Sequence, residues 1–148
     1  MNDTLTEKNK VIVRKYREAH NTNHLDPLDD IVAANLIMNK PIPGMPPGLE
    51  GAKLIHSVLV AVWPDIQTST HELIAEGDKV VEHWTECGTH TGVAFMGVAA
   101  SGKSFTMTGM SIYRIADGKI VEHWGNGDEL SMFQQLGVIP PLAQGGSS

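Results

Sequence analysis

The 148-residue chain carries 17 acidic side chains against 11 lysines and arginines, which gives a formal net charge of −6. Such a surface repels a phosphate backbone, so we expect no nucleic-acid partner. Hydrophobic residues make up 41% of the chain, yet no run approaches the roughly 18 consecutive apolar residues that a membrane helix requires, so we expect no membrane partner either.

The single cysteine, Cys87, excludes an internal disulfide. The polar first ten residues do not resemble a secretion signal, and together these features favour a cytoplasmic location. The length fits one domain over residues 1–148, with a mobile tail at 143–148.

Two helices are predicted near the start of the chain. Apolar residues recur at helical spacing over 4–20, where Thr4 followed by Glu7 fits a capping box. Residues 23–35 predict a second, short helix that starts at the cap Asp26 and has a proline in its first turn.

The next stretch predicts a short strand, a loop and a buried helix. Residues 35–40 are a strand candidate, and 41–51 hold four prolines and three glycines, which is typical of an irregular loop. Residues 52–63 are apolar on most sides, which predicts a helix buried between a sheet and a further layer.

The second half of the chain has the alternating pattern of extended structure. Four strands are predicted over 66–77, 79–92, 104–116 and 119–128. Glycine-containing turns separate them, except for a longer loop at 93–103, which is a candidate lid or rim. A short helix follows at 129–137 and ends at a glycine. Helices followed by long antiparallel strands predict an α+β domain.

Alternation predicts which side chains face inward. Carboxylates rarely point into a core. In the strand 79–92 we therefore expect the alternate side chains that include glutamates to face solvent or a subunit partner, and the other alternate side chains to face the interior. The expected outward set is Glu82, Trp84 and Glu86, with Trp84 at a dimer interface, and the inward set is His83, Thr85 and Cys87.

In the last strand, Trp124, Asn126 and Asp128 share one face. Neighbouring glycines leave room, so this face predicts a wall of a small-molecule pocket. The alternative for Asp128 is a helix N-cap, since aspartate is a favoured cap and a helix follows. His123 has the opposite parity and is expected to lie outside.

Two other signals are weak. Residues 97–104 match the phosphate-loop pattern literally, but a strand follows instead of the required helix, so we expect no nucleotide site. The seven histidines show no known metal-ligand spacing, so no metal site is expected.

Several motifs together resemble the SnoaL-like polyketide cyclase family of the nuclear transport factor 2-like superfamily. They are the segments 9–21, 48–66, 88–92, 95–103 and 110–124, then Asp128 and "QQLG" at 134–137. The resemblance implies a cystatin-like, cone-shaped α+β fold, in which a curved antiparallel sheet wraps around helices. It also implies a pocket at one end of the cone and a homodimer or higher homo-oligomer formed through the sheet.

The resemblance further implies a reaction. Similar cyclases use an aspartate after the last tryptophan as acid/base, which falls on Asp128, and they close a ring by intramolecular aldol condensation without metal or cofactor. We expect the substrate to be a small hydrophobic or ketonic molecule. The expected substrate-binding residues are His83, His90, Trp124, Asn126, Met110, Tyr16, Trp63 and Asn39, the last standing where many relatives carry histidine.

Two further interpretations stay open. The same cone can serve as a non-catalytic ligand-binding or dimerisation module, because fold does not fix function. Ketosteroid isomerases and epoxide hydrolases belong to the same superfamily, but their additional acidic residues are not evident in this sequence.

Overall fold

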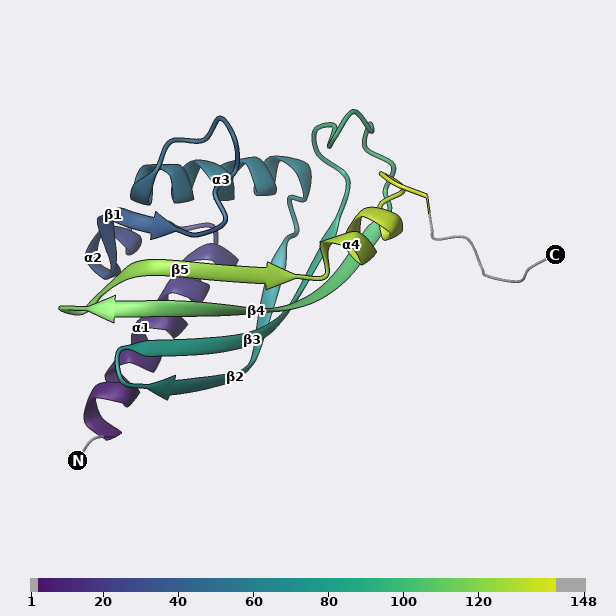
Figure 1. Cartoon of the computed structure of the whole chain (residues 1–148). Helices are drawn as coiled ribbons and strands as arrows, with labels where there is room; N and C mark the ends of the chain where they lie inside the picture. Colours follow the sequence, from purple (N-terminus) through teal and green to yellow (C-terminus); the bar gives the residue numbers. More distant parts are fainter. Residues whose placement is uncertain (1–2, 141–148) are drawn as a thin grey trace.

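The computed structural model describes residues 3–140, which form four helices and five strands (Figure 1). In chain order the elements are α1 (Asp3–Asn21), α2 (Leu28–Ile31), β1 (Val32–Met38), α3 (Gly48–Val62), β2 (Gln67–Glu76), β3 (Lys79–Thr89), β4 (Ser104–Ala116), β5 (Lys119–Gly127) and α4 (Glu129–Gln135). The predicted tail at 143–148 lies outside the described residues.

The strands form one curved sheet in the order β1-β5-β4-β3-β2, antiparallel except where β1 runs parallel to β5 (Figure 1). Helices α1 and α3 pack on the same face of this sheet, which we call the inner face. The opposite side is the outer face. This arrangement confirms the predicted α+β fold with a curved sheet wrapped around helices.

Most predicted elements are confirmed. The four long strands and the terminal helix lie within one to three residues of the predicted bounds, and α4 is followed by Gly137 at a positive φ of 74°. The predicted helix at 23–35 is wrong in length, because only one turn forms and Asp26 makes no side-chain cap. Val32 already pairs with Ile120 of β5, and its β-branched side chain favours the extended form.

The predicted capping box is also wrong. The first helix begins at Asp3, so Thr4 lies inside α1 instead of capping it. Of the apolar residues at helical spacing in α1, Ile12, Tyr16 and Ala19 pack in the main core cluster. Leu5, which has the same spacing, is instead 57% exposed.

The predicted facing of β3 is reversed. Glu82 and Trp84 are buried on the inner face, whereas His83 is partly exposed and Cys87 is exposed. The prediction assumed that carboxylates avoid a core, but Glu82 is neutralised there by Arg17, and Glu86 accepts a hydrogen bond from Thr68. The expected role of Trp84 at a dimer interface is therefore wrong.

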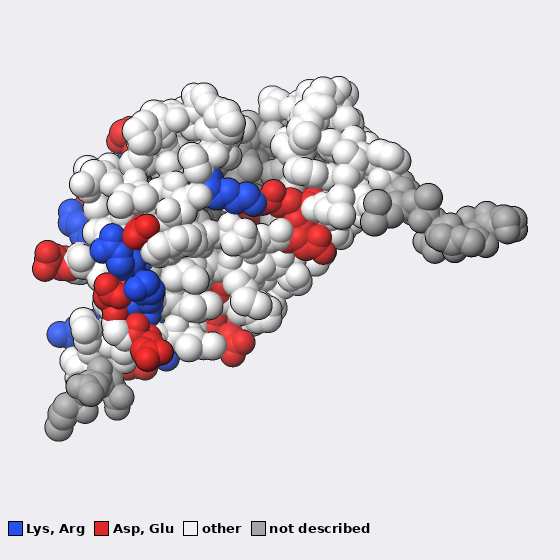
Figure 2. All heavy atoms as spheres, in the orientation of Figure 1, with Lys and Arg blue, Asp and Glu red and all other residues white. Residues whose placement is uncertain are grey.

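Charge is distributed unevenly over the surface. Figure 2 shows charged side chains gathered at the end of the sheet where β4 turns into β5, while the surface over α3 and the loop after β3 carries few. Among the described residues, no helix is long and apolar enough to cross a membrane.

Candidate active site

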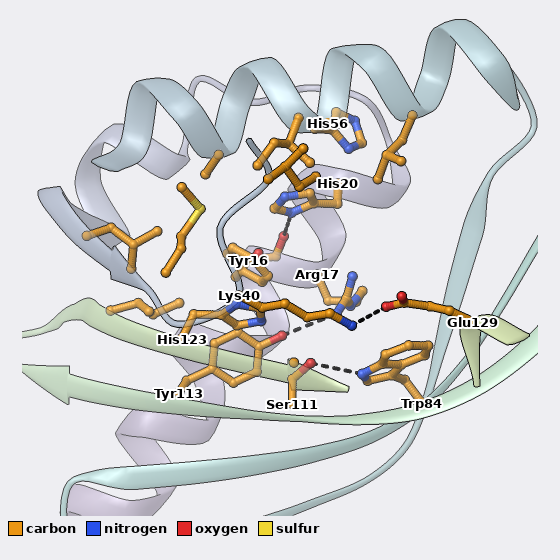
Figure 3. Close-up of a pocket in the computed structure, with 18 residues that line it drawn as sticks. Tyr16, Arg17, His20, Lys40, His56, Trp84, Ser111, Tyr113, His123 and Glu129 are labelled. Carbon is orange, nitrogen blue, oxygen red and sulfur yellow. Dashed lines mark hydrogen bonds and ion pairs between the residues drawn. The ribbon is translucent and has the colours of Figure 1, made fainter. Parts of the chain in front are cut away.

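A cavity of about 280 Å³ lies between the inner face of the sheet and helices α1 and α3 (Figure 3). Its apolar wall comes from β1, the following loop, α3 and β5, through Leu36, Met38, Ile42, Ala52, Ile55, Leu59 and Ile120. Its polar wall comes from α1, the loop after β1, α3, the sheet and the start of α4, through Tyr16, Arg17, His20, Lys40, His56, Trp84, Ser111, Tyr113, His123 and Glu129.

A buried ion pair forms the floor on the sheet side. Glu82, with no exposed surface, accepts hydrogen bonds from Arg17 Nε at 3.0 Å and Arg17 Nη2 at 2.7 Å. It accepts two more, from the Thr70 hydroxyl at 2.6 Å and the Tyr113 hydroxyl at 2.7 Å. Burial raises the pKa of Glu82, but these bonds and the Arg17 charge outweigh it, so the pKa lies below its usual value.

Arg17 is thereby held at the cavity wall by two elements of the sheet. Its Nη2 also donates to the Tyr113 hydroxyl at 3.2 Å, while the Tyr113 hydroxyl itself donates to Glu82. Burial raises the pKa of Tyr113 well above its usual value, so this phenol stays protonated. The arrangement fixes a guanidinium beside the cavity, with its charge balanced by Glu82.

His20 is a neutral base of fixed tautomer. Its Nδ1 lies 2.8 Å from the carbonyl oxygen of Tyr16, and because a carbonyl only accepts, Nδ1 carries the proton and donates. Burial lowers the pKa of His20 to about 3, against the opposing effect of this hydrogen bond. At neutral pH, Nε2 therefore has a free lone pair.

Two further histidines line the same cavity. Burial, assisted by the Arg17 charge, lowers the pKa of His123 to about 4, and its ring lies 5.1 Å from that of Tyr113. His56 packs edge-on against His20 at 4.8 Å, its Nε2 lies 3.1 Å from Asn23 Oδ1, and burial also lowers its pKa. The cavity thus holds three uncharged imidazoles near one guanidinium (Figure 3).

Tryptophan and glycine shape the end of the cavity near α4. The Trp84 indole donates to Ser111 Oγ at 2.9 Å and lies against Gly109, where a β-carbon would collide with the ring. A β-carbon at Gly125 would lie 3.0 Å from the His123 ring, so this glycine leaves the imidazole free to face the cavity.

An exposed ion pair borders the cavity. Lys40, from the loop after β1, extends across the front of the view to Glu129 at the start of α4 (Figure 3). Both side chains line the cavity and both are exposed, so the pair contributes little to stability. It joins the loop after β1 to the start of α4.

The predicted catalytic aspartate lies elsewhere. Trp124, Asn126 and Asp128 do share a face, but it is the outer face, where they border a shallow depression with Met110. Asp128 is exposed and caps α4, because its carboxylate accepts a hydrogen bond from the Ser131 amide at 3.2 Å. The expected enclosed pocket wall at these four residues is therefore wrong, and the alternative, a helix cap, is confirmed.

Most other predicted binding residues also lie outside the cavity. His83 faces outward toward Glu72 at 3.6 Å, and Asn39 is exposed and donates to Glu122 at 2.9 Å. Trp63 is packed in the second core cluster. His90 is buried at the base of the loop after β3, where its Nε2 donates to the Val93 carbonyl at 2.8 Å.

Tyr16 alone of the predicted residues lines the cavity. Sequence reasoning missed Arg17, His20 and His56, and it placed His123 outside. One signal was available: Tyr16 and His20 are four residues apart on a helix, so their side chains project from one face. Among the described residues, no group of three or more His, Cys, Asp or Glu side chains is arranged to hold a metal ion.

Comparison with known proteins identifies the family. The family model of the SnoaL-like polyketide cyclases matches residues 10–136, and the chain belongs to this family. No curated protein matches the chain.

Solved structures agree. The chain is similar to TsrD from Streptomyces laurentii, with 25% identity and a TM-score of 0.81 over 90% of this chain and 97% of that one. It is 31% identical to IdmH from Streptomyces antibioticus, a proposed polyketide cyclase, with a TM-score of 0.76 over 87% and 98% of the two chains. A proposed polyketide cyclase from Acidithiobacillus ferrooxidans is 28% identical, with a TM-score of 0.76 over 88% and 95%.

Proposed function

We propose that this chain is a cofactor-free acid/base enzyme that closes a ring by intramolecular aldol addition in a small ketonic or polyketide-like substrate. Membership of the cyclase family supports the reaction class. The cavity supports the reaction site, because it combines an apolar wall with a few convergent polar groups. In place of the expected Asp128, we assign the acid/base role to side chains inside the cavity.

His20 acts as the base in this proposal. Its Nε2 removes a proton from the carbon beside a substrate carbonyl, and the electron pair moves to the carbonyl oxygen as an enolate. The low pKa keeps the ring uncharged at neutral pH but makes it a weak base in the free enzyme. The enolate formed in the same step balances the new imidazolium charge and so raises the proton affinity of the ring during the reaction. Arg17 stabilises the enolate oxygen from the cavity wall.

Ring closure then needs a second proton transfer. The enolate carbon attacks the other carbonyl carbon, the new carbon–carbon bond forms, and the resulting alkoxide takes a proton. His20 returns the proton it accepted, while a neutral His123 donates a hydrogen bond to the attacked carbonyl, so the net reaction is an isomerisation. The single observation that carries the proposal is a neutral His20 of fixed tautomer in the cavity beside Arg17.

A panel of flexible diketones tests the proposal through formation of cyclic hydroxyketones. We expect His20→Gln to lower kcat about 100-fold or more, since a positioned general base contributes about 10²–10⁴-fold. Asp128→Asn is the matched control, because asparagine preserves the helix cap and the outer face is not used. Loss of turnover in Asp128→Asn with full activity in His20→Gln would contradict the assignment.

The alternative is a non-catalytic module that binds an apolar ligand in the same cavity. Tight binding of ketones with no turnover by any panel member would favour it. We also propose that the outer face pairs two copies of the chain, because Ile74 and Met110 are each 58% exposed there. Apolar residues form a row across this face through the pairs Ile74–Val81, Val81–Ile112 and Ile112–Trp124. Sedimentation of Met110→Glu as a monomer, with the unaltered chain as a dimer, would support the pairing.

A further inference from the structure

A second cavity lies beneath the proline-rich loop that follows β1. Its volume is about 380 Å³, and it is bordered by Ile37 of β1 and by Met45 and prolines of the loop. Apart from Asn35, its lining side chains are aliphatic, methionine, proline or glycine. The cavity therefore suits a hydrocarbon and has little to offer a polar ligand.

Three side chains belong to both cavities. Leu36, Met38 and Ile42 line this second cavity and also the apolar wall of the active-site cavity. The two spaces therefore adjoin at three apolar residues, of which methionine is flexible and adapts its shape readily. A substrate chain that leaves the polar groups of the first cavity meets this wall next.

The loop above the second cavity is held at both ends. At its start, the Asn39 amide donates to the His123 carbonyl at 3.0 Å, and the Asn39 side chain also bonds to Glu122. At its end, Gly51 lies so close to the Pro46 carbonyl that a β-carbon there would collide with it. Between these points Ile42, which lines both cavities, is 44% exposed.

The volumes of the two cavities also favour a ligand that occupies both. Ligand sites commonly occupy roughly 300–1,000 Å³, so the first cavity alone is at the small end for a polyketide-like molecule. The two cavities together fall well within that range.

We propose that the second cavity is a subsite for the hydrocarbon chain of the substrate, whose reacting carbonyl lies in the first cavity. The inference rests on the proposed function for the carbonyl end. It names the substrate class as a ketone carrying a linear or lightly branched aliphatic chain, with Met38 and Ile42 at the junction between the two spaces and Met45 limiting the length of chain accepted.

Binding of methyl ketones whose chains lengthen one methylene at a time, measured by calorimetry, tests the subsite without relying on turnover. We expect the affinity to rise about fourfold per methylene until both cavities are filled, because each buried methylene contributes a nearly constant increment. Met45→Trp fills the second cavity, so we expect it to abolish the rise for long chains and leave short ketones unaffected.

Val11→Trp is the control, because Val11 is 44% exposed in a surface hollow on α1, away from both cavities. We expect it to bind the whole series as the unaltered chain does. An affinity that does not depend on chain length, or an unchanged slope in a folded Met45→Trp, would overturn the subsite alone. No binding of any ketone would overturn both the subsite and the ketonic substrate, whereas a normal slope without turnover would leave the subsite standing and contradict only the enzyme.

Discussion

Replacing Glu82 with leucine would leave the Arg17 guanidinium, whose side chain is only 15% exposed, without its counter-charge. All four hydrogen bonds that the carboxylate accepts would be lost with it. Removal of one partner of a buried pair typically costs about 3–5 kcal/mol, against a total stability of about 5–15 kcal/mol for a domain. We therefore expect Glu82→Leu to lower Tm by about 10 °C, using about 2–4 °C per kcal/mol for a domain of this size.

Urea unfolding followed by circular dichroism measures this loss directly. The double variant Arg17→Met/Glu82→Leu removes both charges and should recover most of the stability, since apolar pairs of similar volume replace buried ion pairs well. Thr70→Ala removes one bond only and should cost about 1 kcal/mol. A loss below about 1 kcal/mol in Glu82→Leu, or a double variant no more stable than the single one, would refute the role given to this pair.

Three other predictions concern pH, the helix cap and a glycine. His20 and His123 are uncharged in the folded chain and titrate near pH 6.5 in the unfolded chain. As the pH is lowered from about 6.5, the free energy of unfolding should therefore decrease by up to about 1.4 kcal/mol per pH unit for each ring. In a profile of Tm against pH, His20→Gln should reduce the slope. Asp128→Ala should destabilise by about 0.5–2 kcal/mol in denaturant unfolding, with Asp128→Asn near neutral. Gly109→Ala should cost about 1–3 kcal/mol through overpacking against Trp84 and shift its fluorescence.

The strands and their order along the chain could be predicted, because alternation and turn residues are local signals. The length of the early helix at 23–35 could not be predicted, since pairing of Val32 with β5 depends on residues nearly ninety positions away. The shared face of Trp124, Asn126 and Asp128 was correct, but alternation alone does not say which face the helices cover.

Prediction of the candidate site depended on which face of β3 was taken to lie inward. Glu82 was assigned to solvent because a carboxylate in a core is costly, yet Arg17 sits on a helix 65 positions earlier and compensates that cost. A sequence shows neither this partner nor the packing of α1 on β3. Once Glu82 is inward, the outward facing of His83 follows by alternation along β3.

The most direct test of the central claim is the exchange of α-protons for deuterium in a bound ketone, followed by NMR in D₂O. The account predicts that the enzyme accelerates this exchange, that His20→Gln abolishes the acceleration, and that Asp128→Asn retains it. Acceleration that survives in His20→Gln and disappears in Asp128→Asn would contradict the assignment of the reaction to the inner cavity.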